Sequence, residues 1–168
     1  MVSIDLFRDG MARLAGAVNL ITTDGPMGFA GITATAVCSV TDQPPTLLTC
    51  INRASYAHAI FSANGVMCVN VLAADQQDVA QLFANRNISM PDRLARIATH
   101  LLATGSPALD GALVSFDCRI VQQHPLGSHD LFIGEVQAVS TGSGAAGLTY
   151  FQRNYHPVGS PSLAQATG

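Results

Sequence analysis

The chain of 168 residues contains no lysine. Chemistry that needs an amine side chain, such as a Schiff base with pyridoxal phosphate or the lysine of a phosphate-binding loop, is therefore excluded. Charged residues are also scarce, at 11% against the roughly 25% typical of soluble globular proteins. No run of about 18 apolar residues could span a bilayer, so we expect no membrane association. We expect instead that a second copy covers part of the apolar surface in a homodimer.

The sequence also lacks CxxC pairs and clusters of basic residues. The eight arginines are scattered over a chain of net charge −3, so nucleic acid is not an expected partner. The first ten residues have neither a basic nor an apolar block, and we read no signal peptide there. No CxxC pair occurs, which favours buried free thiols in a reducing cytoplasm over disulfides or a metal site. The four cysteines are Cys38, Cys50, Cys68 and Cys118.

Short strands with mostly short connections make up most of the pattern. The sequence predicts a first helix capped by Ser3, with Ile4, Phe7, Met11 and Leu14 on one side. We expect an antiparallel barrel, mainly β with peripheral helices, as one domain over residues 1–157 with a polar tail over 158–168. The expected strands are 17–23, 29–41, 46–52, 66–72, 114–120, 131–140 and 148–151; the expected helices are 55–63, 75–86 and 91–102, and 105–111 is expected to be a turn region.

The most informative stretch is residues 31–41, because its alternation gives a strand two different faces. One face carries Ile32, Ala34, Ala36, Cys38 and Val40, and the other carries Thr33, Thr35, Ser39 and Thr41. Small residues beside hydroxyls let a flat ligand approach the backbone and meet hydrogen-bond donors. The strand therefore predicts a cofactor-binding surface, with an ordinary half-buried strand as the alternative.

Three other motifs have to be weighed. Residues 142–147 match the dinucleotide fingerprint GxGxxG, but a strand is expected after them and no acidic residue follows Glu135, so a flexible glycine turn fits better. Residues 52–55 place Arg53 beside a helix start at Ser55, which favours an anion, although a plain N-cap is the alternative. His124 and His129 lack the partners of a zinc site or a catalytic triad, so we expect no metal; His129 is either an exposed loop residue or a ligand contact.

Taken together, these segments resemble the short-chain flavin reductases that serve two-component flavin monooxygenases. Within that family the chain is most similar to the reductase component of 4-hydroxyphenylacetate 3-monooxygenase, followed by the flavin reductase of pyrimidine utilisation. The resemblance covers nearly the whole chain. Its most specific parts are residues 7–12, 19–25, 31–42, 44–45, 50–52, 68–72, 83–84, 127–129 with Gly134, 150–151 and 155–156.

The resemblance implies a Greek-key split β-barrel homodimer that binds FMN or FAD, oxidises NADH or possibly NADPH, and passes reduced flavin to an oxygenase component. It implies that His129 contacts the nicotinamide. The implied flavin-binding residues are Thr33, Thr35, Ala36, Val37, Cys38 and Ser39 at the ring, Asn52, Arg53 and Ser55 at the phosphate, Phe83 and Ala84 at the flank, and Gly127 and Tyr150. Three positions depart from the family pattern: Leu82 replaces a frequent basic residue, Asn85 a frequent glycine and Leu94 a usual phenylalanine.

In such an enzyme the cofactors carry the hydride chemistry, and the protein holds the two rings face to face. Two alternatives stay open: a flavin- or haem-binding barrel without NADH activity, and a structural barrel that acts in oligomerisation. The sequence leaves undecided the choice of FMN or FAD, of NADH or NADPH, the identity of the oxygenase, and whether flavin is a prosthetic group or a diffusing substrate.

Overall fold

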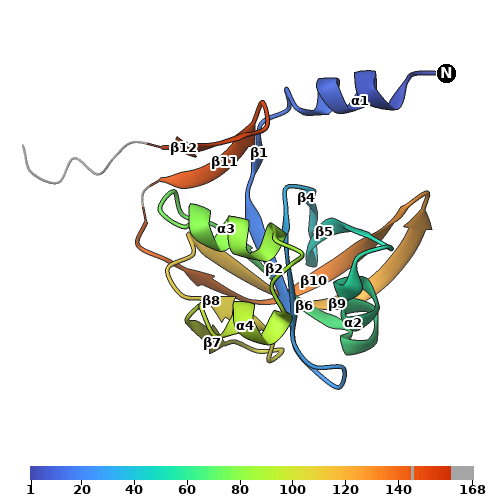
Figure 1. Ribbon diagram of the computed structural model, residues 1–168. Coiled ribbons are helices and arrows are strands. Elements are labelled where there is room, and N and C mark those ends of the chain that lie inside the picture. Colours follow the sequence, from blue (N-terminus) through green and yellow to red (C-terminus); the bar gives the residue numbers. More distant parts are fainter. Residues whose placement is uncertain (145, 160–168) are drawn as a thin grey trace, which may run out of the picture.

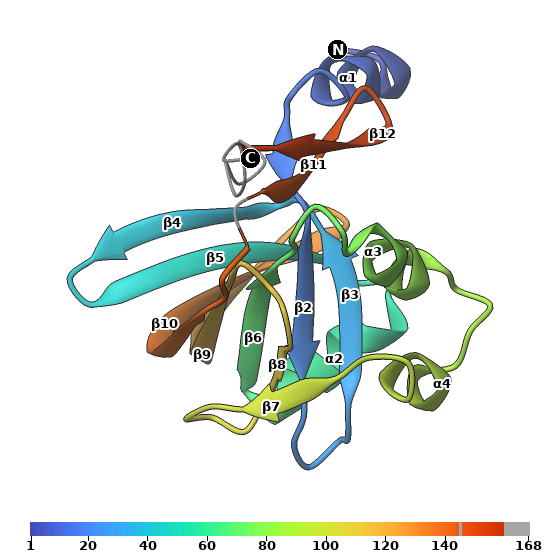
Figure 2. The ribbon, with the colours of Figure 1, turned by 90° about the vertical axis from the view of Figure 1, so that its left-hand side faces the viewer.

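Antiparallel strands dominate the computed structural model, which describes residues 1–144 and 146–159 (Figures 1 and 2). Seven strands form one sheet in the order β3-β2-β6-β9-β10-β5-β4, and every neighbouring pair is antiparallel. The sheet curls so that its edge strands, β3 and β4, are joined through Thr35 and Ala36. The strands are β2 (Asn19–Thr23), β3 (Ala30–Ala34), β4 (Val37–Asp42), β5 (Pro45–Asn52), β6 (Val66–Val71), β9 (Val114–Leu126) and β10 (His129–Thr141). The mainly β, antiparallel fold class is confirmed.

The single strand predicted over residues 29–41 is wrong, because the chain changes partner in its middle. β3 pairs with β2 as far as Ala34, and β4 pairs with β5 from Val37 onward. Between them the Val37 amide donates to the Thr35 carbonyl at 2.9 Å, which marks a tight bend. β4 is then an edge strand with little packed against it, so Cys38 is exposed and Val40 is 50% exposed instead of lying in the core.

Two apolar clusters hold the sheet from its two sides. Helix α2 (Tyr56–Asn64) contributes Phe61 to the cluster in the barrel interior, where its ring packs against Phe132 with centroids 6.4 Å apart. On the other side, helix α3 (Gln77–Ala84) buries Phe83 in a second cluster. All five residues of β2 are buried because the strand lies between these clusters, with Ile21 in the first and Leu20 in the second.

The segment between α3 and β9 differs most from the sequence prediction. The expected helix over 91–102 is replaced by a short helix, α4 (Met90–Leu94), and a strand, β7 (Thr99–Leu101). The expected turn over 105–111 contains β8 (Pro107–Leu109), which pairs with β7. Helix α3 is also shorter than predicted. These three-residue strands are too short to show an alternating pattern, so the sequence gives no periodic signal for them.

An arm projects from the barrel at the two ends of the chain (Figure 1). It contains helix α1 (Ile4–Met11), capped by Ser3 as predicted, and a small sheet in the order β1-β11-β12. Its strands are β1 (Gly16–Ala17), β11 (Gly147–Phe151) and β12 (Asn154–Val158); β12 was not predicted. No residue of α1 is buried. Most of the predicted polar tail, residues 160–168, lies outside the described residues.

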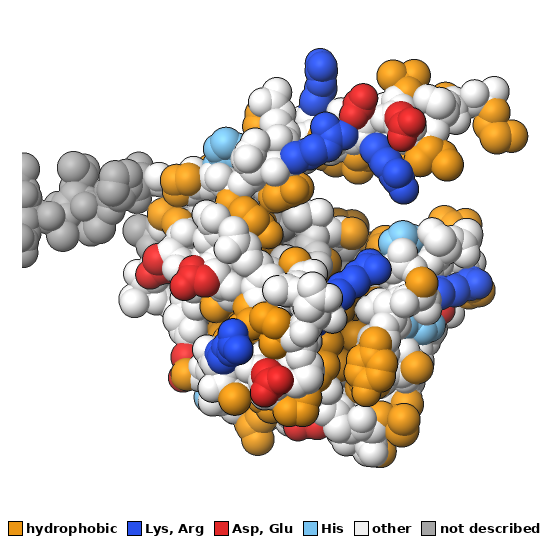
Figure 3. Space-filling model, in the orientation of Figure 1, with side chains coloured by type: hydrophobic (Ala, Val, Ile, Leu, Met, Phe, Trp, Pro, Cys, Tyr) orange, Lys and Arg blue, Asp and Glu red, His pale blue; other side chains and the backbone are white. Residues whose placement is uncertain are grey.

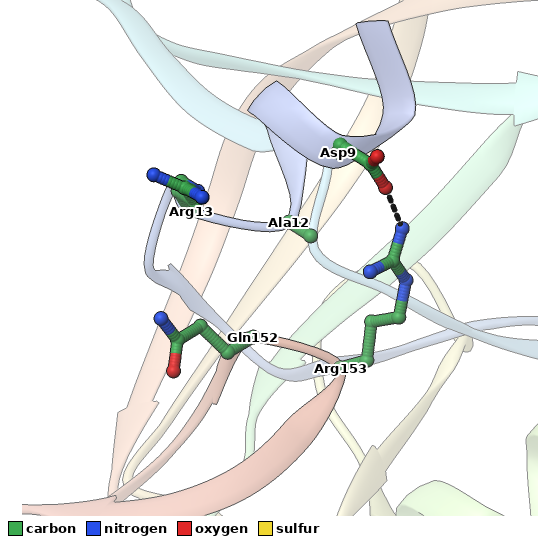
Figure 4. Close-up of a pocket in the computed structure, with 5 residues that line it drawn as sticks. All are labelled: Asp9, Ala12, Arg13, Gln152 and Arg153. Carbon is green, nitrogen blue, oxygen red and sulfur yellow. Dashed lines mark hydrogen bonds and ion pairs between the residues drawn. The ribbon is translucent and has the colours of Figure 1, made fainter. Parts of the chain in front are cut away.

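The hairpin between β11 and β12 fastens α1 to the arm (Figure 4). The Gln152 amide donates to the Ala12 carbonyl at 2.7 Å, and Arg153 Nη2 lies 2.6 Å from Asp9 Oδ1. Gln152 and Arg153 both have positive φ, 48° and 61°, as a two-residue hairpin turn of this handedness requires. Within residues 1–144 and 146–159, no helix has the length and apolar character needed to cross a membrane.

Candidate functional site

A cavity of about 900 Å³ opens at the bend between β3 and β4. It lies between the side of the molecule that carries α3 and α4 and the side that carries α2, and Figure 3 shows the hollow with hydrophobic side chains inside it. Its volume is within the range of small-molecule sites. Eight of the residues predicted for the site line this cavity: Thr33, Thr35, Ala36, Asn52, Ser55, Phe83, Ala84 and His129.

Small side chains make up much of the wall. Alanines contribute at five positions, so a flat ring could approach the backbone closely: Ala34, Ala36, Ala54, Ala57 and Ala84. The expected ladder of free hydroxyls is reduced, because Thr33 Oγ1 donates to the Ala80 carbonyl of α3 at 2.7 Å. The Thr35 side chain is exposed at the bend and stays available to a ligand.

The start of α2 forms another part of the wall. Asn52 Oδ1 accepts the Ala54 amide at 2.8 Å, which folds the chain after β5 into a tight turn. Ser55 is the N-cap residue, but its side chain accepts no capping hydrogen bond. The first amides of α2 therefore lack a side-chain partner on the side where Ser55, Tyr56 and Ala57 line the cavity.

His129 lies beside this turn because of strand register. It is the first residue of β10 and pairs directly with Asn52, the last residue of β5. Its Nδ1 lies 2.9 Å from Ser128 Oγ, so Nε2 is the ring nitrogen left for a ligand. Gly127 has a φ of 59° in the turn before it, a conformation that glycine adopts without strain.

Asp130, the next residue, binds three side chains on the opposite face of β10, from the turn after β5, from α2 and from β9. Its carboxylate is 2.5 Å from Arg53 Nε, 2.6 Å from Gln123 Nε2 and 2.9 Å from His58 Nε2. The hydrogen bonds from Arg53 and then Gln123 lower the pKa of Asp130 to about 2. The carboxylate is therefore an acceptor only, and His58 must donate through Nε2–H. We call these four side chains the Asp130 cluster.

Two arginines line the cavity that were not among the predicted site residues, Arg86 and Arg93. Arg86 follows α3, although the predicted helix over 75–86 included it, and Arg93 lies in α4, where a longer helix over 91–102 was expected. A local signal for the start of α4 exists: Ser89 Oγ accepts the Asp92 amide at 3.3 Å and donates to the Asp92 carboxylate at 2.6 Å, which is a capping pair.

Six predicted residues do not line the cavity. Arg53 belongs to the Asp130 cluster, and Tyr150 packs against Tyr155 in the arm, with ring centroids 5.1 Å apart. The remaining four are Val37, Cys38, Ser39 and Gly127. The thiols differ from the prediction as well: Cys68 and Cys118 are buried, but Cys38 is exposed and Cys50 lies half-buried in the cavity wall.

Other candidate sites offer less. A smaller cavity of about 350 Å³ lies between α1 and the β11–β12 hairpin, lined by exposed charged side chains (Figure 4). The GxGxxG match begins after β10 and ends at Gly147, the first residue of β11, so a strand takes the place of the helix of a dinucleotide fold; residue 145 lies outside the described residues. Over the described parts of the chain, no three histidine, cysteine or acidic side chains gather as metal ligands.

Comparison with known proteins gives a consistent result. Residues 11–159 match the flavin reductase like domain family. The protein named FMN reductase (NADH) RutF of Stutzerimonas stutzeri strain A1501 is 55% identical over 154 residues, 92% of this chain and 88% of that protein. Its counterpart in Variovorax paradoxus strain S110 is 51% identical over 155 residues, 92% and 86% of the two chains. The crystal structure of BorF, the flavin reductase component of a bacterial two-component tryptophan halogenase, has a TM-score of 0.87 at 28% identity and covers 95% of this chain and 100% of that one.

Proposed function

The chain belongs to the flavin reductase like domain family, and we propose that it is an enzyme that reduces FMN with NADH. The observation that carries the proposal is the composition of the cavity wall: small residues at the β3–β4 bend, uncapped amides at the start of α2, and His129 beside them. The names of the relatives, FMN reductase (NADH), support FMN and NADH as the preferred pair. FAD as a second flavin and NADPH as a second donor remain options for the assay.

The residues present fit a flavin. A flavin held here would supply the hydride-accepting chemistry, so the protein would need to hold and shield two rings instead of supplying an acid and a base. The alanines at the bend let the ring lie against the backbone, and Thr35 can donate a hydrogen bond to its polar edge. Phe83 and Ala84 would cover the flank. Asn52 orders the turn that presents the first amides of α2, and His129 Nε2 would orient the nicotinamide.

A further part of the proposal concerns which oxygenase receives the reduced flavin. The resemblance left two assignments, and the relatives named RutF favour the flavin reductase of pyrimidine utilisation over that of 4-hydroxyphenylacetate 3-monooxygenase. We infer that the chain supplies reduced FMN to the oxygenase of pyrimidine utilisation. A coupled assay with each purified oxygenase would distinguish the two assignments. Product formation only with the oxygenase of 4-hydroxyphenylacetate 3-monooxygenase would overturn this inference.

A homodimer is part of the proposal. Five large apolar side chains along the first helix and just after it are 47–68% exposed, and none of the described parts of the chain buries them: Ile4, Leu6, Phe7, Met11 and Leu14. A second copy is the occupant we propose, because the arm extends away from the barrel that could otherwise bury them (Figure 1). Light scattering at micromolar concentration tests this, and a monomer there would contradict it.

Steady-state oxidation of NADH and NADPH, with FMN, FAD and riboflavin in turn, tests the activity. We expect NADH consumption that requires added flavin and is fastest with FMN. If the protein binds flavin in a fluorescence titration but NADH never bleaches it, the chain is a flavin-binding protein, not a reductase. If no flavin binds at all, the cavity has another ligand and the proposal fails.

A further inference from the structure

The wall of the cavity carries positive charge, whereas the chain as a whole is acidic. The chain as a whole has a net charge of −3. Among the described residues that line the cavity, however, two are arginines, Arg86 and Arg93, and none is aspartate or glutamate. A partly enclosed wall with charges of one sign raises the local concentration of ligands of the opposite sign. The cavity therefore favours an anionic ligand, although the molecule is acidic overall.

Arg93 cannot supply much of that attraction to a ligand, because its guanidinium is already in use. It is 6% exposed and donates to three backbone carbonyls: Phe83 at 3.0 Å, Asn85 at 2.5 Å and Ile88 at 2.9 Å. Its guanidinium carbon also lies 5.9 Å from the centre of the Phe83 ring. Arg93 thus ties the end of α3 to the loop that follows, and burial lowers its pKa.

Arg86 lies inside the loop that Arg93 holds and has the opposite character. Its side chain is exposed, and within the described parts of the chain it makes no ion pair or side-chain hydrogen bond. Its backbone is nevertheless ordered on both sides, because Asn85 Oδ1 accepts the Asn87 amide at 3.0 Å and Arg93 holds Asn85 and Ile88. The loop therefore presents a free guanidinium to the cavity from a fixed position.

Position 82 offers no cation for the same purpose. Leu82 is half-buried and packs against the second apolar cluster with the rest of α3. Across the cavity from this loop, Ser55 and the uncapped amides of α2 supply neutral donors. A phosphate bound by both walls would gain hydrogen bonds from α2, but among these groups Arg86 alone offers an unpaired full positive charge.

We propose that Arg86 binds the phosphate of the flavin and makes the enzyme distinguish FMN from riboflavin. The inference rests on the proposed function, because it assumes that the ring lies at the β3–β4 bend. Arg86 acts on binding and selectivity and takes no part in hydride transfer. Its contribution should depend on salt, since the guanidinium is exposed and ions screen it.

Fluorescence titrations of FMN and riboflavin against the full-length protein and Arg86→Gln test the inference. We expect the Kd for FMN to rise about tenfold in the variant, as loss of one charge-assisted contact implies, while the Kd for riboflavin changes less than about twofold. Arg86→Lys keeps the charge and should retain part of the FMN affinity. Arg96→Gln is the matched control, because Arg96 is also exposed, is close in the sequence and does not line the cavity; it should leave both Kd values unchanged.

The outcomes separate the two proposals. The inference is wrong if the wild type binds FMN and riboflavin with the same Kd, or if Arg86→Gln weakens the binding of both flavins equally. Either result would mean that Arg86 does not bind the phosphate. The reductase proposal would still stand. If the wild type binds neither flavin, the proposed function itself fails. Raising the salt concentration should weaken FMN binding by the wild type more than by Arg86→Gln, and equal salt dependence would also count against the inference.

Discussion

Replacing Arg93 by methionine tests how the cavity wall is built. The change removes three charge-assisted hydrogen bonds, to the carbonyls of Phe83, Asn85 and Ile88, and leaves those carbonyls to find water or stay unpaired. Such bonds contribute about 1.5–3 kcal/mol each. Methionine avoids the cost of burying a cation and fills much of the same space, which offsets part of the loss. We expect a net destabilisation of about 3 kcal/mol.

For a domain of this size, 1 kcal/mol corresponds to roughly 2–4 °C in Tm, so Arg93→Met should melt about 6–12 °C below the wild type. Because Phe83 and Ala84 line the cavity, a looser loop should also raise the Kd for FMN by about tenfold. Arg93→Lys retains the charge without the planar guanidinium, so its Tm and its Kd for FMN should lie between those of the wild type and of Arg93→Met. The protein concentration must be equal in all samples, since self-association shifts Tm.

The control for this experiment is Arg96→Met, an exposed position whose replacement should change the free energy of unfolding by less than about 0.5 kcal/mol. If Arg93→Met melts within 2 °C of the wild type and binds FMN as tightly, the three hydrogen bonds do not organise the loop. The assignment of separate roles to Arg93 and Arg86 would then have no basis.

Three further changes give sharp expectations. A Cβ at Gly31 would lie 2.6 Å from Phe83 Cε1, so Gly31→Ala should displace that ring, cost about 1–3 kcal/mol in urea unfolding and weaken FMN binding; Gly10→Ala, with nothing within 4 Å, is the control and should not destabilise. His129→Ala should raise the KM for NADH several-fold at an unchanged Kd for FMN, and an unchanged KM would remove its nicotinamide role. Because the pKa of Asp130 falls from 3.8 to about 2 on folding, its stabilising effect is complete above pH 3.8 and is lost as the pH drops through 2. Tm should therefore decline below pH 4 less steeply in Asp130→Asn than in the wild type, and parallel curves would contradict the assignment.

The sequence was informative wherever a pattern was local and repeated. The strands predicted over 114–120 and 131–140, the Ser3 cap and the helix predicted over 55–63 follow from residue type and spacing, and the structure has them in β9, β10, α1 and α2. The bend at Thr35 and Ala36 was not predicted, because alternation between Ile32 and Thr41 is interrupted only at Val37, an apolar residue at a position of the hydroxyl face. Only the strand partners on either side reveal that one run of sequence serves two edges of the sheet.

The site was predictable to a similar degree. The turn at Asn52, the Phe83–Ala84 pair and His129 lie in recognisable motifs, and the cavity brings them together. Arg86 and Arg93 were missed for a physical reason. Whether a guanidinium binds backbone carbonyls or stays free for a ligand depends on the path of an irregular loop. No spacing rule encodes that path. Arg53 shows the converse, since a promising position beside a helix start is drawn to Asp130 across the sheet.

Asp130 connects the strand that carries His129 with helix α2, whose first residues line the same cavity. Successive residues of a strand point to opposite faces, so His129 lines the cavity while Asp130 holds Arg53, His58 of α2 and Gln123 of β9 on the other side. The strand that presents His129 is thereby bonded to the helix whose first amides would meet the flavin phosphate. Since the pKa of Asp130 is about 2, its carboxylate stays ionised between pH 5 and 8 and keeps accepting hydrogen bonds from Arg53 and Gln123. A change in the KM for NADH over that range would therefore not come from a loss of charge on Asp130.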